Sequence, residues 1–281
     1  MKADLSAAIT DVWQVLDRNS RWMSWNLFLA FVPLTLSVWL FLRGEQKRRC
    51  FFWLLFIDFL TFLPSARKVL FNTFHFIKSS IASELLWLVP LVLIPLYLLF
   101  LLSSKKRWQT FTWSILFLVF YAFLPNAPYV LTDVIHLYDD IRTINSAWII
   151  TLAILPVYIL FIGAGFQAYV LSLINLGFYL KRIGKTRWIL GAELITHALC
   201  AVGVYLGRFL RFNSWDFITQ PDILLTAAIE DLFGKRPVLI TFVTFVAIAS
   251  LYWLMKQVTL GIMAQRLEVV STQTEGNMDV L

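Results

Sequence analysis

Charged residues are scarce in this chain, and so are the residues that usually carry catalysis. Charged side chains make up 15% of the 281 residues, and the chain contains only 3 histidines and 2 cysteines. A soluble domain carries about 25% charged residues, so this composition excludes a water-soluble domain. Cys50 and Cys200 form no CxxC pair, and no GxSxG, HExxH or P-loop motif is present to favour a common class of enzyme.

Hydrophobic residues make up 59% of the chain, and they lie in long blocks without the alternation of a β-barrel strand. A helix that crosses a bilayer needs about 20 apolar residues. The blocks therefore predict an all-α, polytopic transmembrane bundle of about seven spans, built from helical hairpins. The predicted spans are 24–42, 50–64, 84–102, 108–125, 145–171, 188–207 and 236–256. The second is short and contains Asp58, so a re-entrant or interfacial segment is the alternative there.

The two ends of the chain differ from the single transmembrane domain predicted at 24–256. Apolar residues such as Leu5, Ile9 and Leu16 recur at helical spacing within 1–23, which predicts an interfacial helix or else a short tail. Residues 257–281 are polar towards their end, and we expect this tail to be disordered.

The net charge of +7 is explained by short basic connections between the apolar blocks. The connections 43–49, 103–107 and 172–187 fall on one side in a seven-span chain, and the positive-inside rule assigns that side to the cytoplasm. The N-terminus is then outside and the C-terminus cytoplasmic. Membrane lipids are the expected partners, and no basic surface with interleaved aromatic residues argues for nucleic acid.

Comparison of the chain with itself indicates an internal repeat. Residues 50–102 match residues 111–163 at 16 of 53 positions without a gap, whereas sequences this apolar should match by chance at roughly five. The unit is span, polar loop, span, so the two copies are predicted to be parallel.

The fourth predicted span ends in a polar motif. Pro125 and Pro128 predict that the helix breaks near the outer interface, because proline lacks a donor and restricts its predecessor. Thr132 is a predicted N-cap for a new helix, with Asp133 in its first turn. Asp133 and His136 lie three residues apart and are expected to share a helical face.

A second polar motif follows the sixth predicted span. Arg208 and Arg211 share a helical face there, Asn213 or Ser214 could cap the next helix, and Asp216 lies in its first turns. Both motifs fall on the predicted outer side, where polar groups usually pair or line a cavity. The expected pairs join Asp133 or Asp216 to Arg208 or Arg211. The members of the predicted cluster are Asn126, Tyr129, Thr132, Asp133, His136, Arg208, Arg211, Asn213, Trp215 and Asp216.

The strings PNAPYVLTDVIHL (125–137) and GRFLRFNSWD (207–216), with WNLFLAFVPL (25–34), resemble the membrane protein family known as domain of unknown function 1361. The resemblance covers roughly residues 24–256. It implies a multi-pass protein of the bacterial cell (inner) membrane, and it implies no particular reaction.

Three interpretations of the predicted cluster remain open. It could be a purely structural cluster, in which polar side chains form hydrogen bonds with the backbone groups left free at broken helix ends. It could bind or transport a small anionic or lipid-linked ligand, with Arg208 and Arg211 holding the anion and Glu193 and His197 as the candidates for a polar path through the sixth span.

The third interpretation is an outer-face membrane enzyme acting on a lipid-linked or envelope substrate. Asp133 or His136 would then be the catalytic general base. A metal held by Asp133, His136 and Asp216 is conceivable, but the Asp-x-x-His pattern has low specificity, so no metal and no cofactor are expected.

Overall fold

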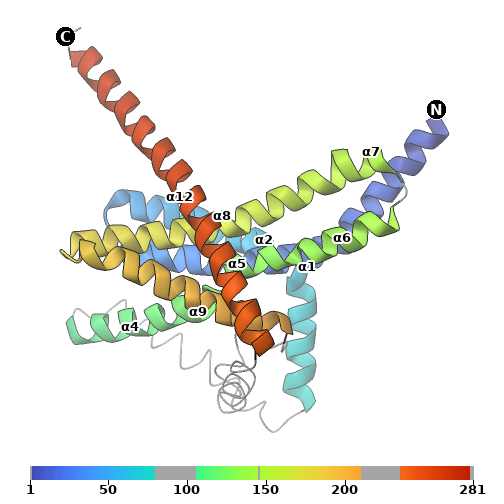
Figure 1. The fold of residues 1–281 in the computed structure, drawn as a ribbon, viewed down its shortest axis with the longest axis horizontal. Coiled ribbons are helices and arrows are strands. Elements are labelled where there is room, and N and C mark those ends of the chain that lie inside the picture. The colour runs from blue at the N-terminus through green and yellow to red at the C-terminus, as the bar shows by residue number, and fades with distance from the viewer. Residues whose placement is uncertain (1, 80–105, 145, 210–234, 279–281) are drawn as a thin grey trace. The chain divides into compact units, whose positions relative to one another are not determined.

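The computed structural model describes residues 2–79, 106–144, 146–209 and 235–278, and within these every regular element is a helix (Figure 1). This confirms the predicted all-α class. The chain divides into two units, Met1–Tyr169 and Val170–Leu281, and helix α8 (Leu155–Arg182) belongs in part to each.

Six helical segments within the described residues are long and apolar enough to cross a membrane, so the predicted class of polytopic membrane protein is confirmed. The predicted span 84–102 lies outside the described residues. The six segments are Val12–Phe41, Lys47–Ala66, Thr110–Thr143, Ala147–Arg182, Thr186–Phe209 and Arg236–Arg266.

Unit 1 begins with two long antiparallel helices, α1 (Lys2–Phe41) and α2 (Glu45–Ser79). Gly44 lies in the turn between them with a φ of 83°, a left-handed conformation that a side chain would strain. The Ser65 hydroxyl donates to the Arg21 carbonyl oxygen at 3.2 Å, which ties the two helices together about midway along each. Helix α2 is continuous, so residues 50–64 belong to a full-length helix and the re-entrant alternative is wrong.

The first and last helices extend beyond the predicted spans. Helix α1 has no break at residue 24, and its apolar crossing segment begins at Val12. Helix α12 (Lys235–Met278) continues through Gln257, where the sequence predicts a disordered tail. Residues 257–266 include Leu260, Met263 and Gln265, which are good helix formers, so the helix has no local reason to stop at 257.

The second half of unit 1 is one helical run with local irregularities. It comprises α4 (Lys106–Phe123), α5 (Asn126–Tyr129), the 3₁₀ turn η1 (Val130–Asp133) and α6 (Val134–Thr143). The run is antiparallel to α1, and the rings of Phe41 and Phe120 meet edge-on at 5.4 Å. Helices α2 and α4 therefore run in the same direction, which is the direction that the seven-span prediction gives them.

The predicted repeat stays a prediction, because much of its first copy lies outside the described residues. Where both copies are described, their local structures differ. Helix α2 continues past Pro64, whereas α4 ends at Phe123, two residues before the aligned Pro125.

Unit 1 closes with a short helix α7 (Ala147–Ile149), the π-helical turn η2 (Ile150–Ile154) and the first part of α8. Here α8 approaches η1 closely at Gly165. A Cβ atom on Gly165 would lie 2.9 Å from both Cγ atoms of Val130, whose side chain is fully buried. A β-branched side chain has little freedom to move away.

Gly165→Ala is therefore expected to destabilise the protein by about 1–3 kcal/mol, the usual cost of overpacking. Gly163→Ala is the matched control, since nothing lies within 4 Å of a Cβ there. That change should be neutral or stabilise the helix by up to about 1 kcal/mol. Thermal unfolding in detergent compares the two variants. Adding Val130→Ala should recover part of the Gly165→Ala loss, and equal stabilities of the two glycine variants would contradict the packing described.

Unit 2 contains the end of α8, the turn η3 (Thr186–Trp188), α9 (Ile189–Phe209) and α12. Helix α8 ends in a Schellman motif, in which Lys185 N–H donates to the Leu180 carbonyl and Gly184 N–H to the Lys181 carbonyl. Gly184 has the required left-handed φ of 75°. Helices α9 and α12 pack against each other.

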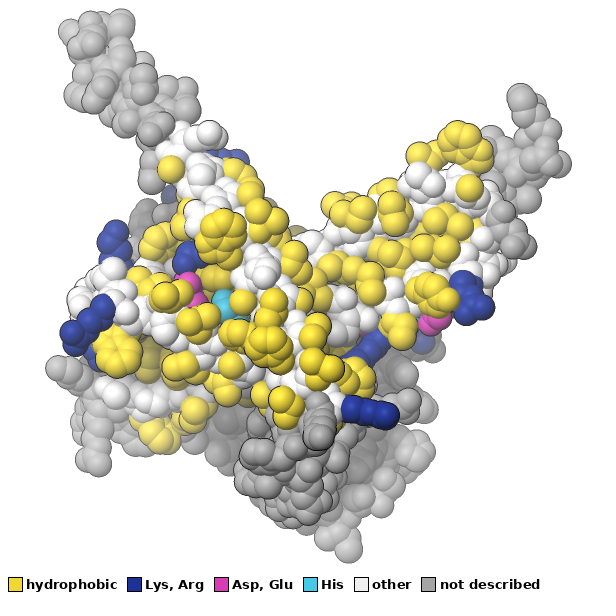
Figure 2. Space-filling model, in the orientation of Figure 1, with side chains coloured by type: hydrophobic (Ala, Val, Ile, Leu, Met, Phe, Trp, Pro, Cys, Tyr) yellow, Lys and Arg dark blue, Asp and Glu magenta, His cyan; other side chains and the backbone are white. Residues whose placement is uncertain are grey.

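Many large apolar side chains are exposed in both units (Figure 2). Trp53, Leu118 and Leu160 are each more than 60% exposed. In the crossing segments of α2 and α12, only 11% of the apolar stretch of 18 residues is buried within the protein. A water-soluble protein rarely tolerates such faces, so these surfaces are the ones expected to meet lipid.

Candidate functional site

The predicted helix break is present and places Asp133 inside unit 1. Helix α4 ends at Phe123, and the backbone remains in the right-handed helical region through Pro125 and onward to α6. The predicted N-cap at Thr132 is wrong. Its hydroxyl donates to the Tyr129 carbonyl at 2.8 Å, while Asp133 occupies the N-cap position of α6 without a side-chain capping bond. A helical backbone on both sides leaves few free N–H groups for a cap to satisfy.

Asp133 is 1% exposed, and its carboxylate points at helix α1. The Asn26 amide donates to Asp133 Oδ2 at 2.8 Å. Because a buried carboxylate needs donors, this bond has a direct role in the packing of α1 on η1. The predicted pairing of Asp133 with Arg208 or Arg211 stays a prediction, because Arg211 lies outside the described residues and Arg208 belongs to unit 2.

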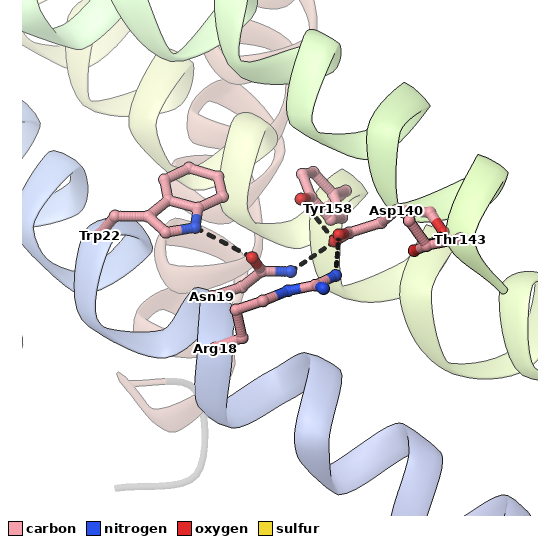
Figure 3. Close-up of polar contacts among 6 residues, drawn as sticks. All are labelled: Arg18, Asn19, Trp22, Asp140, Thr143 and Tyr158. Carbon is pink, nitrogen blue, oxygen red and sulfur yellow. Dashed lines mark hydrogen bonds and ion pairs between the residues drawn. The ribbon is translucent and has the colours of Figure 1, made fainter.

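A second carboxylate, Asp140, lies two turns further along and accepts hydrogen bonds from three residues (Figure 3). Arg18 and Asn19 of α1 both donate to it, and the Tyr158 hydroxyl of α8 donates to Oδ2 at 2.9 Å. The Asp140 side chain is 7% exposed, whereas that of Arg18 is 55% exposed. Three helices of unit 1 therefore meet at one buried carboxylate.

His136 lies between the two carboxylates and contacts Trp22. The ring centroids are 4.6 Å apart, and the Trp22 indole N–H donates to Asn19 Oδ1 at 3.0 Å. Trp22 also meets Phe161 of α8 edge-on at 5.5 Å. The indole thus joins the histidine to the hydrogen bonds around Asp140.

These contacts form an antiparallel polar seam between α1 and the η1–α6 segment. Asn19 pairs with Asp140, Trp22 with His136, and Asn26 with Asp133. We use the name polar seam for a fixed set of residues. They are Arg18, Asn19, Trp22, Asn26, Asp133, His136, Asp140 and Tyr158.

The other members of the predicted cluster have different positions. Asn126 donates to the Phe123 carbonyl at 2.9 Å, and the Tyr129 carbonyl accepts from Thr132, so these residues serve the local backbone. Arg208 lies in the last turn of α9, in unit 2. Arg211, Asn213, Trp215 and Asp216 lie outside the described residues.

Glu193 and His197 have partners within unit 2. Tyr252 and Lys256 of α12 both donate to Glu193 Oε1, at 2.7 Å and 2.6 Å. The His197 ring lies 4.7 Å from that of Tyr252. Satisfied in this way, the two residues join α9 to α12, which supports a packing role and gives no support to the predicted polar path.

Six seam residues are absent from the predicted cluster, although the sequence contains a signal for four of them, Asn19, Trp22, Asn26 and Asp140. The other two are Arg18 and Tyr158. Asp133, His136 and Asp140 recur at intervals of three and four, which places them on one helical face. Asn19, Trp22 and Asn26 show the same spacing in the first helix. Two polar stripes of equal length in apolar helices could have been matched, but their antiparallel register could not be read without the fold.

No metal site is formed by the part of the chain that the structure describes, where no three His, Cys, Asp or Glu side chains gather suitably. Asp216, the third residue of the conceivable metal set, is not among those residues.

Together, the long apolar helices and their buried polar contacts define an integral membrane protein of the polytopic helical class. The chain belongs to the family described as "Protein of unknown function (DUF1361)", whose model matches residues 25–105 and 87–250. The family match confirms the resemblance of the motifs. No curated protein and no solved structure matches the chain.

Proposed function

We propose that the polar seam binds a small anionic group, free or lipid-linked, at the outer interface of the bacterial cell membrane through Arg18. One observation carries the proposal. The Arg18 guanidinium is ion-paired with the buried Asp140, and yet the Arg18 side chain as a whole remains 55% exposed. Guanidinium has five N–H donors in a rigid fork, so an arginine fixed on one side can bind a phosphate or carboxylate with the other.

The position of Arg18 supports this proposal. It lies in the second turn of the crossing segment that begins at Val12, close to where lipid headgroups are expected. Asp140 aligns the guanidinium, and Trp22 and Tyr158 hold Asn19 and Asp140 in turn. An arginine aligned in advance loses less conformational freedom on binding than a free surface arginine.

The structural interpretation shares the same bonds, because the seam also holds three helices together. The enzyme interpretation draws less support from the described residues. A general base must reach its substrate, and Asp133 is 1% exposed and already accepts a hydrogen bond from Asn26.

Binding is tested by thermal unfolding of the purified protein with phosphatidylglycerol, phosphatidylcholine or inorganic phosphate added. We expect phosphatidylglycerol to raise the unfolding temperature of the wild type, and Arg18→Gln to abolish that increment. Arg182→Gln is the matched control, because Arg182 is also exposed and lies at the end of α8.

A shift with phosphate alone would indicate a free anion as ligand, and a shift with the lipid alone would indicate a headgroup. Equal increments in the wild type and in Arg18→Gln would overturn the proposal and leave the seam a structural element.

A further inference from the structure

A fourth buried carboxyl group among the described residues, Asp58, lies in the middle of helix α2 and away from the polar seam. It is nine residues after Arg49 and nine before Arg67 in one continuous helix. At about 1.5 Å per residue, this places Asp58 roughly 13 Å from each charged position along the helix axis. A hydrocarbon core is about 30 Å thick, so Asp58 lies at the middle of the crossing segment.

The surroundings of Asp58 offer a single hydrogen bond. The Thr35 hydroxyl of α1 and Asp58 Oδ2 are 2.7 Å apart, and the Asp58 residue is 8% exposed. Its other oxygen, Oδ1, is buried and has no hydrogen-bond partner among the described residues. Half of the carboxyl group is therefore unsatisfied.

No opposite charge faces Asp58 from the helices that carry it and pack on it. Residues 22–42 of α1 and residues 50–66 of α2 contain no other charged side chain and no histidine or tyrosine. The nearest cation positions along this part of the chain are Arg43, just beyond α1 and eight residues after Thr35, and Arg21, fourteen before Thr35. Each is more than two helical turns away.

The other buried acids of the crossing helices are different. Asp140 has a guanidinium, an amide and a phenol as donors, and Glu193 has an ammonium and a phenol. Asp133 accepts from the Asn26 amide. An ionised carboxylate in an apolar interior needs such donors, whereas a neutral acid needs far fewer and tolerates an unpaired carbonyl oxygen.

We infer that Asp58 is a proton-binding site within the membrane and carries its proton as a neutral carboxylic acid at neutral pH. The proton lies on the carboxyl group, which shares it with the Thr35 hydroxyl. Loss of the proton would create an unpaired charge between α1 and α2. The close packing of these two helices therefore depends on the bound proton, because the charged form would require water or a cation to enter.

Infrared difference spectroscopy of wild type and Asp58→Asn tests this inference, because asparagine keeps the shape of the neutral acid. We expect Asp58→Asn to fold with an unfolding temperature close to that of the wild type. The wild type should show the carbonyl stretching band of a protonated carboxylic acid, and the variant should lack it. Loss of carboxylate bands in the variant would overturn the inference, and so would a failure of Asp58→Asn to fold.

A hydrophobic carbodiimide gives a second reading on the unmodified chain. These reagents add to neutral carboxylic acids in membranes and leave a stable N-acylurea. Mass spectrometry of labelled wild type should locate the adduct at Asp58, with at least tenfold less at Asp140, which is ion-paired. Labelling of Asp140 in place of Asp58 would contradict the inference.

Discussion

Replacing Asp140 with alanine is expected to lower the free energy of unfolding by about 2–5 kcal/mol. The carboxylate accepts from Asn19, which is 6% exposed, and from Tyr158, which is 1% exposed. Each buried donor left without an acceptor costs about 1–3 kcal/mol. Arg18 adds little to this loss, because its exposed side chain can turn to water.

The neighbouring residue supplies a matched control for this prediction. Asp139 is exposed and carries the same charge one position earlier. Asp139→Ala should change the stability by no more than about 0.5 kcal/mol, as surface substitutions usually do. The fraction of protein that stays monodisperse after heating in detergent measures both variants. If Asp139→Ala and Asp140→Ala lower the stability equally, the loss reflects net charge and not the polar seam.

Replacing Lys256 with methionine should destabilise unit 2 by about 3–5 kcal/mol, because it leaves the Glu193 carboxylate buried without a cation. The Glu193 side chain is 10% exposed and that of Lys256 21% exposed, so water can compensate only in part. Tyr252 would remain as a donor to Glu193. One neutral donor satisfies a carboxylate poorly inside a membrane.

The double variant Glu193→Gln with Lys256→Met should recover most of this loss. Glutamine is neutral and can still accept the hydrogen bond from Tyr252, so neither an unpaired charge nor an unpaired phenol is left. The interaction energy from the four-protein cycle should therefore exceed about 2 kcal/mol. Additive effects of the two changes would show that the ion pair does not join α9 to α12 as described.

The crossing helices could be predicted because hydropathy is a local property of the sequence. The blocks around Phe117, Tyr158 and Ile248 are apolar whatever they contact, and the structure has helices at each. The break near Pro125 was likewise local, since it follows from the missing donor of proline. The ends of the helices were harder to predict, because α1 and α12 extend through residues whose polarity suggested tails.

The partners of the buried polar groups could not be predicted, because they depend on distant parts of the chain. Arg18 and Asp140 are 122 residues apart, and Asn26 and Asp133 are 107 apart. Sequence alone assigned Arg18 to a terminal segment, since a charge counts against a span when its partner is unknown. Asn26 could not be predicted as a partner of Asp133, because hydropathy does not specify the register between the two helices.

The long separation between these partners has a consequence for biosynthesis. Helix α1 is made first, and it enters the translocon with Arg18, Asn19 and Asn26 in or beside its apolar stretch. Ribosomes add about 5–20 residues per second, so Asp140 follows Arg18 by roughly 6–25 s. During that interval the nascent α1 must keep Arg18 and Asn19 near water or within the insertion machinery, and a chain truncated before Val134 would leave these two residues permanently without Asp140.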